Sequence, residues 1–235
     1  MPFLFYDPRY LCFMAPAFIL MLVVQFYVRS AYSKWSQVPA RSRISGLEAA
    51  QRLIQRSGLY DVRIEGTPGQ LTDHYDPRGK VLRLSREVAQ GSSVAALAIA
   101  AHELGHAMQD KEDYFPLRFR AALVPAVNIG SYLGWILLII GILLRFTELA
   151  WLGVIVFSGG ALFALATLPV ELNASRRARQ LLTDTGIIVG EDEQRGVNHV
   201  LNAAALTYVA ALITAVLQLL YYVMLVLGMG GRSRD

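Results

Sequence analysis

Residues 92–110 read S-S-V-A-A-L-A-I-A-A-H-E-L-G-H-A-M-Q-D, and they predict one helix on which the rest of the chain depends. Either serine at its start can cap the N-terminus, and the alanines that follow favour a helix and close packing. His102 and His106 are four residues apart, so they project from the same face of this helix. Two imidazoles at this spacing can bind one tetrahedral Zn²⁺, with Glu103 beside them as the general base for a water molecule.

Two further features of this stretch support a functional reading. The chain has only four histidines, so we set aside the alternative of a surface helix with an incidental histidine pair. Gly105 lies inside the helix, where glycine costs about 1 kcal/mol relative to alanine. That cost predicts a close approach of another helix or of a substrate backbone at Gly105.

The composition indicates a membrane protein. Of 235 residues, 54% are hydrophobic and 17% are charged, which is too apolar for an ordinary soluble domain. Four apolar stretches approach the roughly 20 residues that cross a bilayer as a helix. They are residues 11–28, 123–144, 149–168 and 203–227. The first could be a cleaved signal peptide, but Asp7 and Arg9 flank it and no small-x-small site follows it, which favours a retained anchor.

We therefore predict a mainly α membrane protein with four transmembrane helices and a small zincin-like α+β domain in the cytoplasm. Residues 1–28 form the anchor, 29–122 the cytoplasmic domain, 123–168 a transmembrane hairpin, 169–202 a cytoplasmic helix with the third metal ligand, 203–228 the fourth transmembrane helix, and 229–235 a disordered tail. The short polar turn at 144–148 makes the hairpin, so residues 169–202 return to the side of the histidine helix.

The cytoplasmic domain is predicted to begin with a helix and a small sheet. Ser45 and Glu48 form a capping box that opens a helix ending near Gly58. Three short strands follow, the last two flanking the turn at residues 76–79, and they predict a short antiparallel sheet leading directly into the histidine helix. An edge of this sheet could bind an extended peptide through backbone hydrogen bonds.

A catalytic zinc normally has three protein ligands and one open position, so a third ligand is needed. Gln109 and Glu112 stand where a longer local motif would need glycine and histidine, so the ligand must come from another element. Glu171 is the best candidate, because it follows the third span on a helix predicted to start at Pro169. His74 is the competing ligand, and His199 is predicted to face solvent.

The basic residues predict the orientation of the chain. Residues 29–122 contain 14 lysines and arginines and residues 169–202 contain 4, which leaves 4 for the opposite side. The positive-inside rule then puts the metal site in the cytoplasm and both termini outside. Because basic and acidic residues are interspersed, the chain has no nucleic-acid footprint, and its predicted partners are the lipid bilayer and a peptide or protein substrate, with membrane proteins included.

Four stretches of the chain resemble the YugP-like family of bacterial membrane zinc metallopeptidases. They are 71–77 (L-T-D-H-Y-D-P), 102–109 (H-E-L-G-H-A-M-Q), 170–178 (V-E-L-N-A-S-R-R-A) and 201–210 (L-N-A-A-A-L-T-Y-V-A). The arrangement is also similar to the HtpX-type membrane gluzincins. The resemblance implies a bacterial plasma membrane protein with Zn²⁺ bound by His102, His106 and Glu171, and with Glu103 as the base.

The resemblance leaves the residues around the metal ligands open. In the HtpX type, an aspartate four residues after the glutamate ligand supports the site, and here that position is Ser175. Asp73 or Asp184 could take over this supporting role. His74 or Tyr75 could stabilise the oxyanion of a tetrahedral intermediate, or both could simply orient the strand hairpin.

The function that these patterns predict is that of an integral membrane zinc-dependent endopeptidase. One alternative is a non-enzymatic membrane protein in which the same residues hold a structural zinc, closed by a fourth ligand such as His74. Another is a zinc hydrolase that acts on lipid headgroups at the membrane interface.

Overall fold

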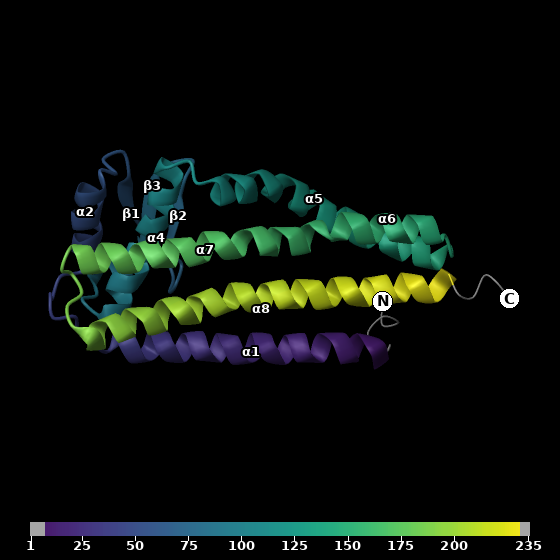
Figure 1. The fold of residues 1–235 in the computed structure, drawn as a ribbon, viewed down its shortest axis with the longest axis horizontal. Coiled ribbons are helices and arrows are strands. Elements are labelled where there is room, and N and C mark those ends of the chain that lie inside the picture. Colours follow the sequence, from purple (N-terminus) through teal and green to yellow (C-terminus); the bar gives the residue numbers. More distant parts are fainter. Residues whose placement is uncertain (1–7, 231–235) are drawn as a thin grey trace. The chain divides into compact units, whose positions relative to one another are not determined.

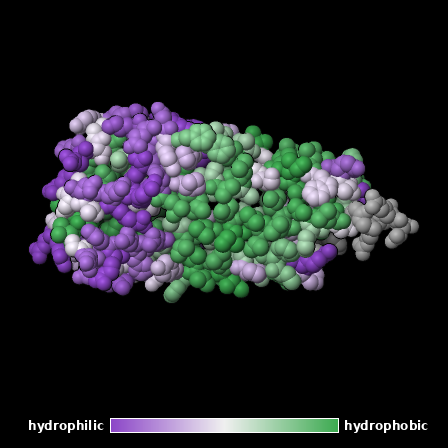
Figure 2. Space-filling model, viewed as in Figure 1, coloured by the Kyte–Doolittle hydropathy of each residue, from purple (hydrophilic) through white to green (hydrophobic). Residues whose placement is uncertain are grey.

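The computed structural model describes residues 8–230, which divide into two compact units. We call the first the membrane unit; its described residues are 8–24, 118–168 and 207–230. We call the second the site unit; it consists of Gln25–Leu117 and Pro169–Leu206. In Figure 2 the membrane unit presents a largely hydrophobic surface and the site unit a largely hydrophilic one.

The membrane unit is built from five helices, four of which extend into the site unit (Figure 1). They are α1 (Pro8–Ser36), α5 (Phe115–Leu143), α6 (Thr147–Phe157), α7 (Gly159–Asp184) and α8 (Glu191–Gly230). By length and composition, α1, α5, α6 together with α7, and α8 are four candidate membrane spans within the described residues. This confirms the predicted mainly α membrane protein with four spans.

Small residues let α5 and α6 pack backbone against backbone in the membrane unit. A Cβ at Gly141 would lie 2.4 Å from the backbone nitrogen of Ala150, and one at Gly153 would lie 2.4 Å from that of Leu138. Such close helix contacts are typical of membrane proteins, where lipid provides no hydrophobic force between helices. The turn at Leu144 and Arg145 joins α5 to α6 where the sequence predicted it.

The helix that carries Glu171 does not begin at Pro169, so that prediction is wrong. α7 starts at Gly159 and contains Pro169 in its interior, so it continues from the third span into the site unit. A proline removes one backbone hydrogen bond, but helices of membrane proteins tolerate this. The break lies earlier, at Ser158 between α6 and α7, where a serine and two glycines lower the helix propensity.

The remaining elements lie wholly within the site unit. These are α2 (Gly46–Ser57), β1 (Arg63–Thr67), β2 (His74–Asp76), β3 (Val81–Ser85), α3 (Arg86–Gln90) and α4 (Val94–Lys111). Ser45 caps α2 by accepting a hydrogen bond from the Glu48 amide at 3.1 Å, and Gly58 ends it with φ of 63°. Ser93 caps α4 in the same way. The short helix α3, which the sequence analysis did not predict, separates β3 from α4.

The small sheet is present, but its pairing differs from the prediction in one strand. β2 and β3 form the expected antiparallel hairpin, whereas β1 pairs parallel to β3, so the order is β1-β3-β2. Residues 68–73 connect β1 to β2 without pairing them, and β3 then lies between β1 and β2. As a result β2 is an edge strand.

Helix α4 forms the centre of the site unit. Leu97, Ala101 and Leu104 have no exposed surface, and the helix packs against Ala50 and Leu53 of α2. His102, Glu103 and His106 keep some exposure on one face. At the C-terminus, α8 includes the first two residues of the predicted tail 229–235, and residues 231–235 lie outside the described part of the chain.

Candidate metal centre

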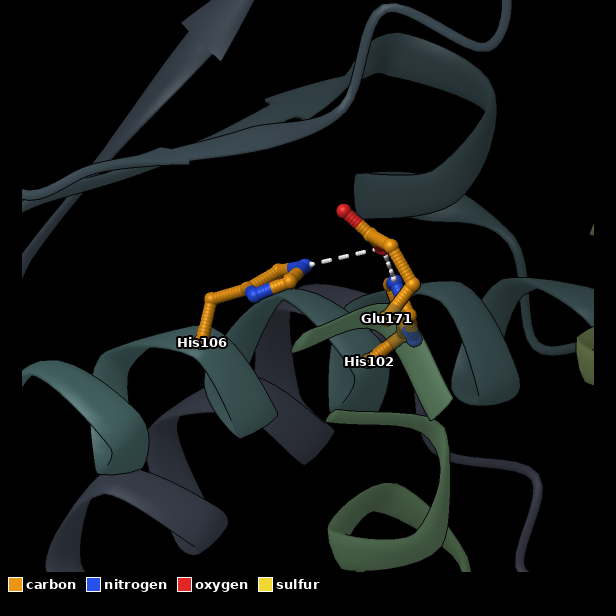
Figure 3. Close-up of side chains that lie close together, drawn as sticks. All are labelled: His102, His106 and Glu171. Atoms are coloured by element: carbon orange, nitrogen blue, oxygen red, sulfur yellow. Dashed lines mark hydrogen bonds and ion pairs between the residues drawn. The ribbon is translucent and has the colours of Figure 1, made fainter. Parts of the chain in front are cut away.

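His102 and His106 of α4 and Glu171 of α7 come together in one cluster of possible metal ligands. One ligand atom from each lies within 4.8 Å of the others. Figure 3 shows a single carboxylate oxygen of Glu171 joined to both imidazoles, at 3.3 Å from each Nε2 atom. Two ligands bound at about 2.0–2.1 Å to one tetrahedral zinc ion lie about 3.3–3.4 Å apart, so the donors are of a type that binds zinc and both histidine–glutamate distances match its geometry.

A close contact between α4 and α7 brings Glu171 to the histidines. A Cβ at Gly105 would lie 2.6 Å from the carbonyl oxygen of Ala174. Ala174 is one helical turn beyond Glu171, and both Ala174 and Val170 are fully buried. The predicted close approach at Gly105 is therefore confirmed, and the partner is the backbone of α7.

The cluster concentrates charge in a buried place. Burial alone would lower the pKa of His106, but Glu171 and Glu103 outweigh it and raise that pKa above its ordinary value. Burial raises the pKa of Glu103, and the two histidines offset only part of this shift. Because metal ligands must lose their protons, a metal ion and protons compete for these groups.

Glu103 lies between the metal cluster and the edge of the sheet. Its Oε2 atom accepts a hydrogen bond from the backbone N–H of Tyr75 at 3.1 Å, and this N–H belongs to the edge strand β2. The Tyr75 hydroxyl donates to Asp110 at 3.0 Å. Burial, together with Asp110, raises the pKa of Tyr75 above its ordinary value, so this hydroxyl keeps its proton.

Three residues were considered around the candidate metal ligands: Ser175, at the position of the supporting aspartate, and Asp73 and Asp184 as its possible replacements. Only Ser175 touches one of the candidate ligands. The Ser175 hydroxyl lies 3.2 Å from Nδ1 of His102. Asp73 instead accepts hydrogen bonds from the backbone N–H and hydroxyl of Ser85, which fixes the β2–β3 hairpin. Asp184 is exposed at the end of α7, about 20 Å beyond Glu171 at 1.5 Å per residue, so it is too distant to support the ligands.

The other two histidines of the chain lie apart from the cluster. His74 is exposed on β2; its Nδ1 atom lies 2.8 Å from the carbonyl oxygen of Thr72 and its Nε2 atom 3.4 Å from Arg83. This geometry argues against His74 as a metal ligand or an oxyanion donor. His199 is half-buried and accepts a hydrogen bond from the Trp35 indole at 3.0 Å, so it is only partly open to solvent.

Gln109 contacts a candidate metal ligand, a role that its sequence position alone had not suggested. It is fully buried, and its Oε1 atom lies 3.0 Å from Nδ1 of His106. Its Nε2 atom donates to the carbonyl oxygen of Val170 and to Asn173. The signal that could have found it was its spacing: Gln109 is three residues after His106 and therefore lies on the same side of α4.

Comparisons with known proteins point to a family of zinc metallopeptidases. Residues 10–227 match the model of a family described as "Putative neutral zinc metallopeptidase". A similar curated protein is "Putative membrane protease YugP" of Bacillus subtilis (strain 168), with 47% identity over 211 residues, covering 90% of this chain and 92% of that protein. No solved structure matches the chain.

Proposed function

Because the chain belongs to this zinc metallopeptidase family, and specifically resembles its YugP-like members, we propose that it is an integral membrane endopeptidase that depends on zinc. The observation that carries the proposal is the cluster of His102, His106 and Glu171 with Glu103 beside it. Two imidazoles and one carboxylate are the ligand set of a catalytic zinc with an open position. Among the described residues no fourth histidine, cysteine or carboxylate joins this cluster, which supports a catalytic site over a closed structural one.

The chain's own residues would divide the chemistry between them. His102, His106 and Glu171 would hold the zinc ion, which when bound polarises a peptide carbonyl and lowers the pKa of a water molecule toward 7. Glu103 would take the proton of the attacking water and later pass it to the leaving amine.

The edge of β2 is the proposed binding strand for the substrate. All three residues of β2 are in register with β3, and the backbone N–H of Tyr75 donates to Glu103. A peptide that adds to this edge by backbone hydrogen bonds would pass beside Glu103. Recognition through the backbone accepts many side chains, so the proposed substrates are extended peptides or unfolded segments, those of membrane proteins included.

We propose the bacterial plasma membrane as the location, with the active site in the cytoplasm. The excess of lysine and arginine in residues 29–122 and 169–202 supports this orientation. A test is a single cysteine at Arg78, on the exposed turn after β2, in a Cys12→Ser background. A membrane-impermeant thiol reagent should label it only after the cells are opened. Labelling in intact cells would show that the active site faces outward and would contradict the proposed orientation.

The activity test compares the wild-type protein with Glu103→Gln in detergent. The substrates are an unfolded protein and a set of quenched fluorescent peptides, each assayed with zinc, after chelation, and after zinc is restored. We expect cleavage by the wild type that chelation removes and zinc restores, and none by Glu103→Gln. Equal cleavage by both proteins would refute the role of Glu103. Loss of folding on chelation without any cleavage would favour a structural zinc, and release of lipid headgroups from a lipid extract would favour a lipid hydrolase.

A further inference from the structure

A chain of hydrogen bonds runs from the metal cluster to the surface between α4 and α7. It runs from His106 to Gln109 on α4, crosses to Asn173 and Arg177 on α7, and returns to Glu112, the residue that caps the C-terminus of α4. We call these five residues the His106 relay. It lies wholly within the site unit. The question is what each bond in the relay forces on the next.

The outer end of the relay fixes Asn173. The Arg177 guanidinium binds Glu112 through two hydrogen bonds of 2.7 Å, and its Nε atom donates to Oδ1 of Asn173 at 2.7 Å. A guanidinium has no acceptor, so the Asn173 atom that faces it must be the amide oxygen. The bidentate ion pair therefore determines which way this buried amide points.

The middle of the relay fixes Gln109. Its Nε2 atom lies 2.8 Å from the carbonyl oxygen of Val170 and 2.9 Å from the same Asn173 oxygen. Both partners only accept, so both amino protons of Gln109 are used and its oxygen must face His106. Val170 immediately precedes Glu171, so the same amide also ties α4 to the backbone that carries the third ligand.

The inner end of the relay determines the state of His106. The Gln109 oxygen can only accept, so Nδ1 of His106 must carry a proton, and the lone pair of Nε2 is left for a metal ion. That Nε2 atom is the one that lies 3.3 Å from Glu171. We propose that Gln109, Asn173 and Arg177 are positioning residues that select Nε2 of His106 as the metal-binding atom; this rests on the zinc site proposed above.

His102 is held in a different way. Its Nδ1 atom faces the Ser175 hydroxyl, which can rotate and either donate or accept. A hydroxyl therefore does not dictate which nitrogen of His102 carries the proton, whereas the relay does so for His106. Removing the amide of Gln109 should therefore weaken zinc binding more than removing the hydroxyl of Ser175.

The test uses Gln109→Met, which keeps the length of the side chain and removes its amide, with Gln180→Met as the matched control. Gln180 is exposed on α7 and lies outside the relay. Zinc affinity is measured by competition with a chromogenic chelator, and the ring nitrogens of His106 by ¹⁵N NMR of histidine-labelled protein with zinc bound. We expect Gln109→Met to bind zinc about 10–100-fold more weakly and Gln180→Met to bind like the wild type.

Two more variants keep the test decisive if Gln109→Met does not fold. Asn173→Asp retains an acceptor for both donors and should bind zinc within about threefold of the wild type, whereas Arg177→Met should lose about tenfold. The NMR spectrum of the wild type should show a protonated Nδ1 on His106.

The relay would be overturned by a folded Gln109→Met with wild-type zinc affinity, or by a zinc-bound His106 with an unprotonated Nδ1. A wild-type protein that binds no zinc would instead refute the zinc site itself. In that case the ¹⁵N spectrum of the metal-free protein at alkaline pH still reads the relay separately, through the nitrogen that keeps its proton.

Discussion

The two helices that form the metal cluster are built differently. α4 carries His102, Glu103 and His106 in one short segment, so their spacing is set by the helix itself. α7 supplies only Glu171, together with the buried Asn173 and Ser175, and these act across the contact with α4. In the proposed zinc site, α4 would therefore set the chemistry, whereas the approach of α7 would decide whether a metal ion can be held.

The largest expected effect separates chemistry from metal binding on α4. Glu103→Gln keeps the shape of the side chain but cannot take a proton, so we expect peptide cleavage to fall by at least about 100-fold. Zinc content should stay near that of the wild type, because Glu103 is not one of the three ligands. The check is the cleavage rate and the zinc content of the same preparation. Loss of zinc from Glu103→Gln would contradict the proposal that Glu103 acts in the chemistry and not in metal binding.

A smaller effect should follow from forcing the two helices apart. In Gly105→Ala, the new Cβ would meet the backbone of Ala174, at a cost of about 1–3 kcal/mol that exceeds the gain of about 1 kcal/mol in helix propensity. We expect the site unit to be less stable by about 1 kcal/mol and zinc to bind more weakly. Thermal unfolding in detergent and chelator competition measure the two effects.

The control for this variant is Gly66→Ala. Gly66 lies in β1, and a methyl group added there would have no neighbouring atom within 4 Å, so the same substitution meets no backbone. Zinc affinity should be unchanged in Gly66→Ala. Equal zinc affinities for the two alanine variants would show that the close contact at Gly105 is not what delivers Glu171.

The smallest expected effect concerns Ser175 on α7. Ser175→Ala removes the hydroxyl that faces His102 and should weaken zinc binding by about tenfold, at the low end for residues that orient metal ligands. Ser175→Asp should bind at least as tightly as the wild type, because a carboxylate accepts the Nδ1 proton more strongly. Chelator competition measures both, and tighter binding by Ser175→Ala than by Ser175→Asp would contradict the orienting role.

The contrast between α4 and α7 also explains how much could be predicted from the sequence. His102, Glu103 and His106 follow from local spacing, and Glu171 follows from the predicted hairpin that returns the chain to the same side. The prediction that the helix of Glu171 begins at Pro169 was wrong, because α7 contains this proline in its interior and membrane helices tolerate interior prolines. The parallel pairing of β1 with β3 arises because the connection from β1 to β2 leaves a place between these two strands. A local sequence pattern does not predict such a connection.

The surroundings of the ligands were harder to predict than the ligands. Ser175 was singled out only as a departure from a related pattern, and Gln109 only as the residue at the glycine position of a longer motif. Ser175 reaches His102 only through the approach of α7 to Gly105. Gln109 contacts His106 within α4, but its orientation depends on Val170 and Asn173 of α7. His74 looked like a ligand by residue type, yet its place on the exposed side of β2 keeps it away.

The central claim is that α7 completes a zinc site begun by α4, and the most direct test is the zinc content of purified wild-type protein beside Glu171→Ala. We predict about one zinc per chain in the wild type and little or none in the variant after equal dialysis, with both proteins folded by circular dichroism. Full zinc retention by Glu171→Ala, or no zinc in either protein, would contradict the account.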